Sequence, residues 1–276
     1  MPYLEIIQEP PTGGGVEHAL FDFDGTVSLI REGWEKIMAP VMYESIAPGQ
    51  EPTPALRQEV LEFIDESTGI QTILQMEHLV EMVRAAGNVP EDQILDAQGY
   101  KDIYIGRLRE VIKDTVAALE AGEADPAEHR VPGSLEFIQH LSERGVTLYV
   151  ASGTDQPDVR REAACVGIAD LIDGGIFGAL RTYKDFSKEV FIRELLEKHE
   201  LAGPELVVFG DGPVEIRLAH QAGAIAVGVG SSPERDSVPD PARRERLIKA
   251  GAHLIIPDFS RWPELLDYLG LEGAPD

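Results

Sequence analysis

The chain has 276 residues, 43% of them hydrophobic, which is long enough for a core domain with an insertion. Its 24 basic and 49 acidic residues give a formal net charge of −25, so we expect no nucleic-acid partner and no anionic membrane surface. No apolar run approaches the roughly 18 residues of a membrane span, and no N-terminal stretch has the pattern of a secretory signal. The single cysteine, Cys165, cannot form an internal disulfide, which favours a cytoplasmic protein.

The first strand predicted along the chain ends in two acidic residues. Residues 1–17 are broken by proline and glycine and predict an irregular lead-in, and the apolar run over 17–23 predicts a buried strand. Asp22 and Asp24 stand two residues apart at its end, so their side chains should share a face. Two like charges about 5 Å apart repel by roughly 3 kcal/mol at an effective dielectric near 20. Such a pair indicates a bound cation or a reaction that needs it.

The segment after this strand has a helical pattern. Apolar residues recur at spacings of three and four, as in Leu56, Val60 and Ile64. The predicted helices span residues 34–46, 54–67, 72–86 and 91–119. Because no strand pattern interrupts them, we predict an all-helical insertion.

Strands and helices alternate over the rest of the chain. The predicted helices span 134–143, 159–165, 188–199, 214–222 and 241–250, with a last helix from 261. The predicted strands span 146–151, 176–177, 206–209, 224–229 and 253–256. This alternation predicts an α/β fold with a parallel sheet covered on both faces. In such sheets, ligands bind beyond the carboxyl ends of the strands.

Polar residues suited to catalysis or ligand binding are predicted at that edge, in the following order along the chain. They are Asp22 and Asp24, then Ser152 and Gly153, then Lys188, then Asp211 and Glu215. This order resembles the motifs of the haloacid dehalogenase (HAD) superfamily: Asp-x-Asp-Gly-Thr, a Ser or Thr, a Lys, and Gly-Asp followed by a second acid. The resemblance spans residues 21–215. It implies a Rossmann-like HAD core over 1–30 and 131–276, with a helical cap domain over 31–130.

The resemblance implies a Mg²⁺-dependent phosphatase that hydrolyses a small-molecule phosphate monoester through an aspartyl-phosphate. Asp22 would be the nucleophile. Asp24 would protonate the leaving oxygen and then deprotonate the attacking water. Dehalogenase relatives lack this second acid, so Asp24 favours phosphate chemistry.

Metal ligands are expected among the same acids. Mg²⁺ prefers few carboxylates together with water and phosphate, which makes Asp22 and Asp211 candidate ligands. The resemblance adds Asp24 through its backbone carbonyl. Glu215 stands where the family more often has Asp, and it would hold the metal either directly or through a water. Alternatively, Asp211 and Glu215 are acids that only favour a helix start.

Phosphate ligands are expected from three places. Ser152 and the N–H groups around Gly153 would bind phosphate oxygens, or Ser152 would only cap a turn. Lys188 would neutralise phosphate charge, with Lys184 as the competing lysine. Thr26 either contacts phosphate or only shapes the turn after the first strand.

Substrate choice is expected to depend on the cap. Arg31 would bind a second anionic group of the substrate, or form a salt bridge instead. Polar candidates near the break at Gly69 either contact the substrate or have structural roles; they are Thr68, Gln71, Thr72 and Gln75. Two other functions stay open, namely a phosphomutase of the same superfamily and a non-catalytic protein that binds a phosphorylated ligand.

Overall fold

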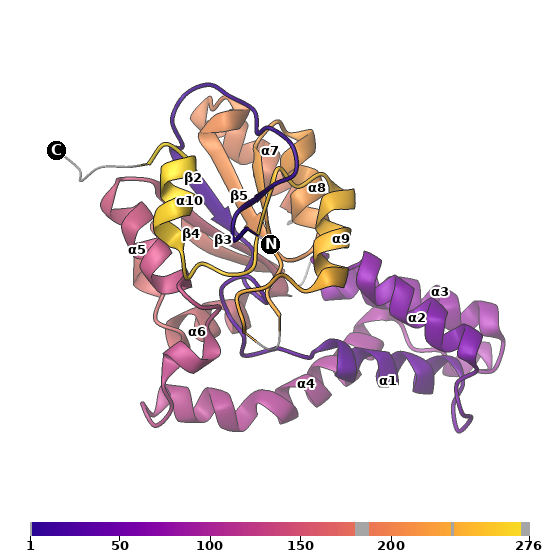
Figure 1. Cartoon of the computed structure of the whole chain (residues 1–276). Coiled ribbons are helices and arrows are strands. Elements are labelled where there is room, and N and C mark those ends of the chain that lie inside the picture. Colours follow the sequence, from indigo (N-terminus) through magenta and orange to yellow (C-terminus); the bar gives the residue numbers. More distant parts are fainter. Residues whose placement is uncertain (1, 180–187, 233–234, 272–276) are drawn as a thin grey trace.

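The computed structural model describes residues 2–179, 188–232 and 235–271. Its centre is a seven-stranded sheet in the order β1-β7-β6-β5-β2-β3-β4 (Figure 1). The strands are β1 (Glu5–Ile6), β2 (His18–Phe21), β3 (Thr147–Asp155), β4 (Gly175–Ala179), β5 (Leu206–Gly210), β6 (Ile225–Val229) and β7 (Leu254–Ile256). Neighbouring strands pair in parallel, except that β1 pairs antiparallel with β7. The predicted α/β fold with a parallel sheet is confirmed.

The structure differs from the prediction at two strands. β1 lies in the segment predicted to be an irregular lead-in, because a two-residue strand has no alternation to detect and depends on its pairing with the remote β7. β3 continues beyond its predicted end at residue 151, with an irregular register against β4 between Ala151 and Asp155. The longer β3 contains Ser152 and Thr154, so both residues belong to the sheet.

Helices cover both faces of the sheet, with bounds close to the predicted ranges. They are α5 (Ser134–Glu143), α6 (Gln156–Cys165), α7 (Lys188–His199), α8 (Pro213–Gln221), α9 (Pro241–Ala250) and α10 (Trp262–Tyr268). Short 3-10 turns are η1 (Glu91–Gln93), η2 (Pro126–His129), η3 (Ala169–Leu171) and η5 (Gly203–Glu205). No helix in the described ranges is both long and apolar enough to cross a membrane.

Alternation along β2 divides the hydrophobic core into two layers, one on each face of the sheet. Phe21 lies in the larger cluster together with residues of α5 and α10. Leu20 lies in the second cluster together with residues of α7, α8 and α9. Five phenylalanines in the larger cluster have no exposed surface (0%). Phe21 stacks on Phe209 at a ring-centroid distance of 4.8 Å, and Phe137 stacks on Phe259 at 5.1 Å.

Residues 35–120 contribute four helices that lie outside the sheet (Figure 1). They are α1 (Glu35–Ile46), α2 (Pro54–Glu66), α3 (Thr72–Ala86) and α4 (Ala97–Glu120). The helix predicted over 91–119 is split, because the Asp96 carboxylate accepts a hydrogen bond from Gly99 N–H at 2.8 Å and caps a new helix start. The predicted helical insertion is confirmed. Its boundaries near residues 31 and 130 stay a prediction.

Ion pairs connect these four helices to the rest of the fold. On one side α4 runs beneath α6, and on the other α2 approaches α9 (Figure 1). The pairs are Lys101–Asp155 at 2.5 Å, Arg109–Asp158 at 2.9 Å, Glu120–Arg161 at 2.6 Å, and Asp65–Arg246. Exposed pairs contribute little to stability. The pair formed by the buried Lys101 is screened less by solvent than the exposed pairs.

The phenylalanine cluster generates a stability prediction. Phe137→Ala should lower the free energy of unfolding by about 3–5 kcal/mol, because it removes buried contacts and leaves a cavity. Urea denaturation followed by circular dichroism measures this loss. The control Val111→Ala, at a position that is 65% exposed, should change stability by less than about 0.5 kcal/mol. Equal losses in both variants would contradict the described core.

Candidate active site

A pocket of about 70 Å³ lies between the carboxyl edge of the sheet and the inserted helices. Its sheet side is formed by residues that follow β2 and β5 and by the last part of β3. These residues are Asp22, Asp24, Ser152, Gly153, Thr154 and Asp211. These residues therefore meet at the carboxyl edge of the sheet, where the alternation of strands and helices predicted a ligand site.

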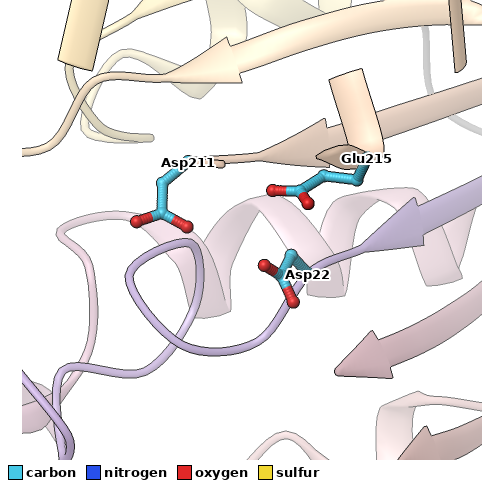
Figure 2. Close-up of side chains that lie close together, drawn as sticks. All are labelled: Asp22, Asp211 and Glu215. Carbon is cyan, nitrogen blue, oxygen red and sulfur yellow. The ribbon is translucent and has the colours of Figure 1, made fainter. Parts of the chain in front are cut away.

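Three buried carboxylates converge beside this pocket (Figure 2). Asp22 follows β2, Asp211 follows β5, and Glu215 lies in the first turn of α8. Each offers one oxygen, and these oxygens lie within 4.8 Å of one another. All three side chains are nearly inaccessible, with residue exposures of 6%, 5% and 1%. Groups of opposite charge, a bound cation or protonation must compensate such a cluster.

Lys188, the first residue of α7, supplies one of these opposite charges. Its Nζ lies 3.0 Å from Asp22 Oδ1 and 3.1 Å from Glu215 Oε2. Burial alone would lower the pKa of Lys188, but the carboxylates of Asp22 and Glu215 raise it above its ordinary value. The lysine therefore stays charged. The Glu215 carboxylate is also fixed locally, because its Oε1 accepts a hydrogen bond from Gly212 N–H at 2.7 Å.

Asp211 has a separate cationic partner. Arg243 in α9 places Nη1 2.9 Å from Asp211 Oδ2. Burial raises the pKa of Asp211 to about 7, and the Arg243 guanidinium opposes that rise. The turn after β2 packs against the same carboxylate. Gly25 has a φ of +78°, and a Cβ there would lie 2.2 Å from Asp211 Oδ2, so the turn requires glycine.

The second acid of the first motif has hydroxyl partners. Asp24 Oδ2 accepts hydrogen bonds from Thr154 Oγ1 at 2.8 Å and from Ser152 Oγ at 3.3 Å. Asp24 Oδ1 is buried without a hydrogen bond and lies 3.9 Å from Arg31 Nε. Asp22 and Asp24 both line the pocket, but only Asp22 contributes its side chain to the carboxylate cluster.

The cluster fits a hard divalent cation. Its donor set consists only of carboxylate oxygens, which Mg²⁺ and Ca²⁺ prefer. Burial raises the pKa of Asp22 well above its ordinary value despite the opposing charge of Lys188. Lys188 and Arg243 therefore do not fully compensate the negative charge of the three carboxylates, and a bound cation would compensate the rest. Among the described residues, the side chains of Asp22, Asp211 and Glu215 lie close enough together to hold it.

A profile of haloacid dehalogenase-like hydrolases matches residues 16–223. The chain belongs to that family. The predicted superfamily is confirmed, and the protein is an enzyme of the HAD-like hydrolase class. A search of curated proteins gave no match.

Solved structures share the HAD fold with this hydrolase. A β-phosphoglucomutase from Clostridium difficile has a TM-score of 0.60 at 14% identity, covering 92% of this chain and 97% of its own. A protein described as a predicted phosphoglycolate phosphatase from Haemophilus somnus has a TM-score of 0.60 at 15% identity, covering 92% and 99%. A hydrolase from Pseudomonas syringae has a TM-score of 0.59 at 16% identity, covering 91% and 98%. At these identities the likeness concerns the fold alone.

The candidate phosphate ligands of this HAD-like hydrolase have different surroundings. Ser152 and Gly153 line the pocket. Thr26 has no exposed surface, and its Oγ1 lies 3.5 Å from Asp211 Oδ1, which favours the structural alternative for this residue. Lys184 lies outside the described residues, so Lys188 is the one of the two lysines with a described position. The phosphate-binding roles stay predictions.

Arg31 lies on the pocket wall, but its guanidinium is already paired. It donates to both oxygens of Glu162, from Nε to Oε2 at 2.9 Å and from Nη2 to Oε1 at 2.6 Å. Arg31 is 6% exposed and Glu162 is 3% exposed. This is the salt bridge that was the alternative for Arg31, and the binding of a second substrate anion stays a prediction.

The helical insertion reaches the site through the turn between α2 and α3. Thr68, Thr72 and Gln75 line the pocket, whereas Gln71 is buried and is not part of its lining. Gly69 packs directly on the acid cluster: its φ is +95°, and a Cβ there would lie 2.3 Å from Glu215 Oε2. Whether the polar residues of this turn choose the substrate stays a prediction.

Three site residues were missed by sequence reasoning. Thr154 stands two residues after Ser152, so a longer predicted β3 would have placed both on one face. Arg243 and Glu162 had no local signal, because each was predicted only as part of a helix and its partner is far away in the sequence.

The raised pKa of Asp211 generates a prediction for the protein in chelator. A folded-state pKa of about 7 against an ordinary 3.8 means that the folded state binds more protons between these pH values. The free energy of unfolding should therefore fall as pH rises from about 4 to about 7. Asp211→Asn should flatten this slope, and urea denaturation across this pH range measures it.

The control is Asp114→Asn, which removes an exposed carboxylate of α4 and should retain the wild-type slope. An unchanged slope in Asp211→Asn would contradict the described environment of this carboxyl group.

Proposed function

We propose that this HAD-like hydrolase is a Mg²⁺-dependent phosphatase that hydrolyses a small-molecule phosphate monoester through an aspartyl-phosphate on Asp22. The observation that carries the proposal is the ion pair between Lys188 and Asp22 inside a buried carboxylate cluster at the pocket. A lysine in that position would neutralise charge on a phosphoryl group as it reaches Asp22. The acidic surface and single cysteine fit a cytoplasmic enzyme with a small-molecule substrate.

Asp22 and Asp211 would hold Mg²⁺, with the Asp24 backbone carbonyl as a further candidate ligand. Bound there, the ion would supply positive charge for the phosphoryl oxygens. Both oxygens of Glu215 already accept hydrogen bonds, from Gly212 N–H and from Lys188. Glu215 would therefore hold the lysine in place and would reach the metal either directly or through a water.

The chemistry would take two steps. The Asp22 carboxylate attacks phosphorus, the bond from phosphorus to the leaving oxygen breaks, and Asp24 gives its proton to that oxygen. Water then attacks the phosphorus of the aspartyl-phosphate and gives a proton to Asp24, which releases Asp22 and inorganic phosphate. Ser152 and Gly153 would bind the phosphoryl oxygens at the end of β3, where both line the pocket.

The same residues would serve a phosphomutase. One solved structure that shares this fold is a β-phosphoglucomutase. A mutase returns the phosphoryl group to its substrate, so an isomerised ester and dependence on a bisphosphate activator would identify it. A protein that only binds a phosphorylated ligand would need no second acid, and Asp24 with its hydroxyl partners favours turnover.

The proposed roles of the two acids predict the behaviour of variants. With Mg²⁺ and a panel of phosphate esters that includes p-nitrophenyl phosphate, Asp22→Asn should release no phosphate. Asp24→Asn should slow turnover of alkyl esters by about 100- to 10,000-fold, as expected for loss of a general acid. A chelator should abolish wild-type activity, and added Mg²⁺ should restore it. Full activity in chelator or in Asp22→Asn would refute the proposal.

The two candidate lysines can be separated with a matched pair of variants. Lys188→Met should lower kcat/KM by about 100- to 1,000-fold, because a preorganised positive charge at the phosphoryl site is lost. Lys184→Met makes the same chemical change four residues earlier and should retain most of the activity. Phosphate release measures both, and circular dichroism checks folding. A loss confined to Lys184→Met would transfer the role to that residue.

A further inference from the structure

The cation on the pocket wall is already paired with a buried carboxylate. Arg31 is the one positively charged side chain among the described residues that line the pocket. Glu162 accepts hydrogen bonds from the Nε and Nη2 edge of its guanidinium, at 2.9 Å and 2.6 Å. Asp24 and Asp158 lie 3.9 Å and 3.6 Å from the same guanidinium. Three carboxylates therefore surround one cation, and the local charge is negative.

The Arg31–Glu162 pair is also difficult to open. Bidentate bonds between a guanidinium and a carboxylate are among the strongest hydrogen bonds in proteins. Both side chains are buried, so a substrate anion that took Arg31 would leave the Glu162 carboxylate buried without its partner. The pair thus favours a substrate that does not bind to Arg31.

The other described residues on this side of the wall are uncharged. Trp34, Ile70, Tyr104 and Leu108 contribute apolar surface, and Thr72 and Gln75 are polar but neutral. The pocket volume of about 70 Å³ is small. Pockets for drug-sized ligands measure roughly 300–1,000 Å³. The space beyond the phosphoryl site therefore suits a small leaving group.

We propose that the enzyme selects phosphate monoesters of small, uncharged alcohols and rejects esters that carry a second anionic group. This inference rests on the proposed phosphatase function and names the substrate class for that site. The competing hypothesis is that Arg31 binds a second anionic group of the substrate. One experiment distinguishes these two hypotheses.

Glycerol 3-phosphate and 3-phosphoglycerate form a matched pair of probes, because they differ only in a terminal CH₂OH or carboxylate group. With saturating Mg²⁺, kcat/KM for glycerol 3-phosphate should exceed that for 3-phosphoglycerate by at least about tenfold, since like charges would meet in the second case. An equal or reversed ratio would overturn the inference.

Glu162→Gln tests whether the ion pair sets this preference. The variant removes one carboxylate and frees part of the Arg31 guanidinium, so the ratio should shift several-fold toward 3-phosphoglycerate, mainly through KM. Glu143→Gln makes the same charge change on an exposed position of α5 and should leave the ratio unchanged. An unchanged ratio in a folded Glu162→Gln variant would overturn the role of the pair.

Binding of the two esters to Asp22→Asn, measured by calorimetry with Mg²⁺, separates this inference from the proposed function. Should wild type hydrolyse no ester, the proposed function fails. Tighter binding of glycerol 3-phosphate would still support the charge argument. Equal or tighter binding of 3-phosphoglycerate would overturn it.

Discussion

The buried contact of Lys188 with Asp22 and Glu215 is the interaction on which the site depends. Carboxylates removed from water are costly unless charge and hydrogen bonds compensate them. Lys188 does so at the start of α7, and Arg243 in α9 does the same for Asp211. The parallel sheet makes this arrangement possible, because the ends of its strands and the starts of the following helices meet at one edge.

The inserted helices complete the site from the other side. Gly69 lets the turn before α3 approach Glu215 closely, and ion pairs connect α4 to the end of β3 and to α6. A covered site strengthens electrostatic interactions by excluding water. Arg31 lies in the segment that connects the core to α1. Its hydrogen bonds to Glu162 attach this segment to α6. The same pair therefore links the position of the insertion to the charge of the pocket.

The sequence allowed the prediction of features that depend on local pattern. Helices such as α5 and α7 have the predicted ranges because amphipathic spacing is periodic, and Asp22, Lys188 and Asp211 follow from motif order at strand ends. Features that depend on distant partners left no such pattern. Thr154 bonds Asp24 across 130 positions, and Arg243 bonds Asp211 across 32. The two-residue β1 likewise exists only through its pairing with β7.

The central claim is that a phosphoryl group passes through Asp22, and trapping that intermediate tests it most directly. Wild-type enzyme turning over a hydrolysed ester with Mg²⁺ would be quenched in acid within the first turnovers, digested and sequenced by mass spectrometry. The account predicts a phosphorylated peptide with the modification on Asp22. Phosphate release without a covalent intermediate, or with the phosphoryl group on another residue, would contradict it.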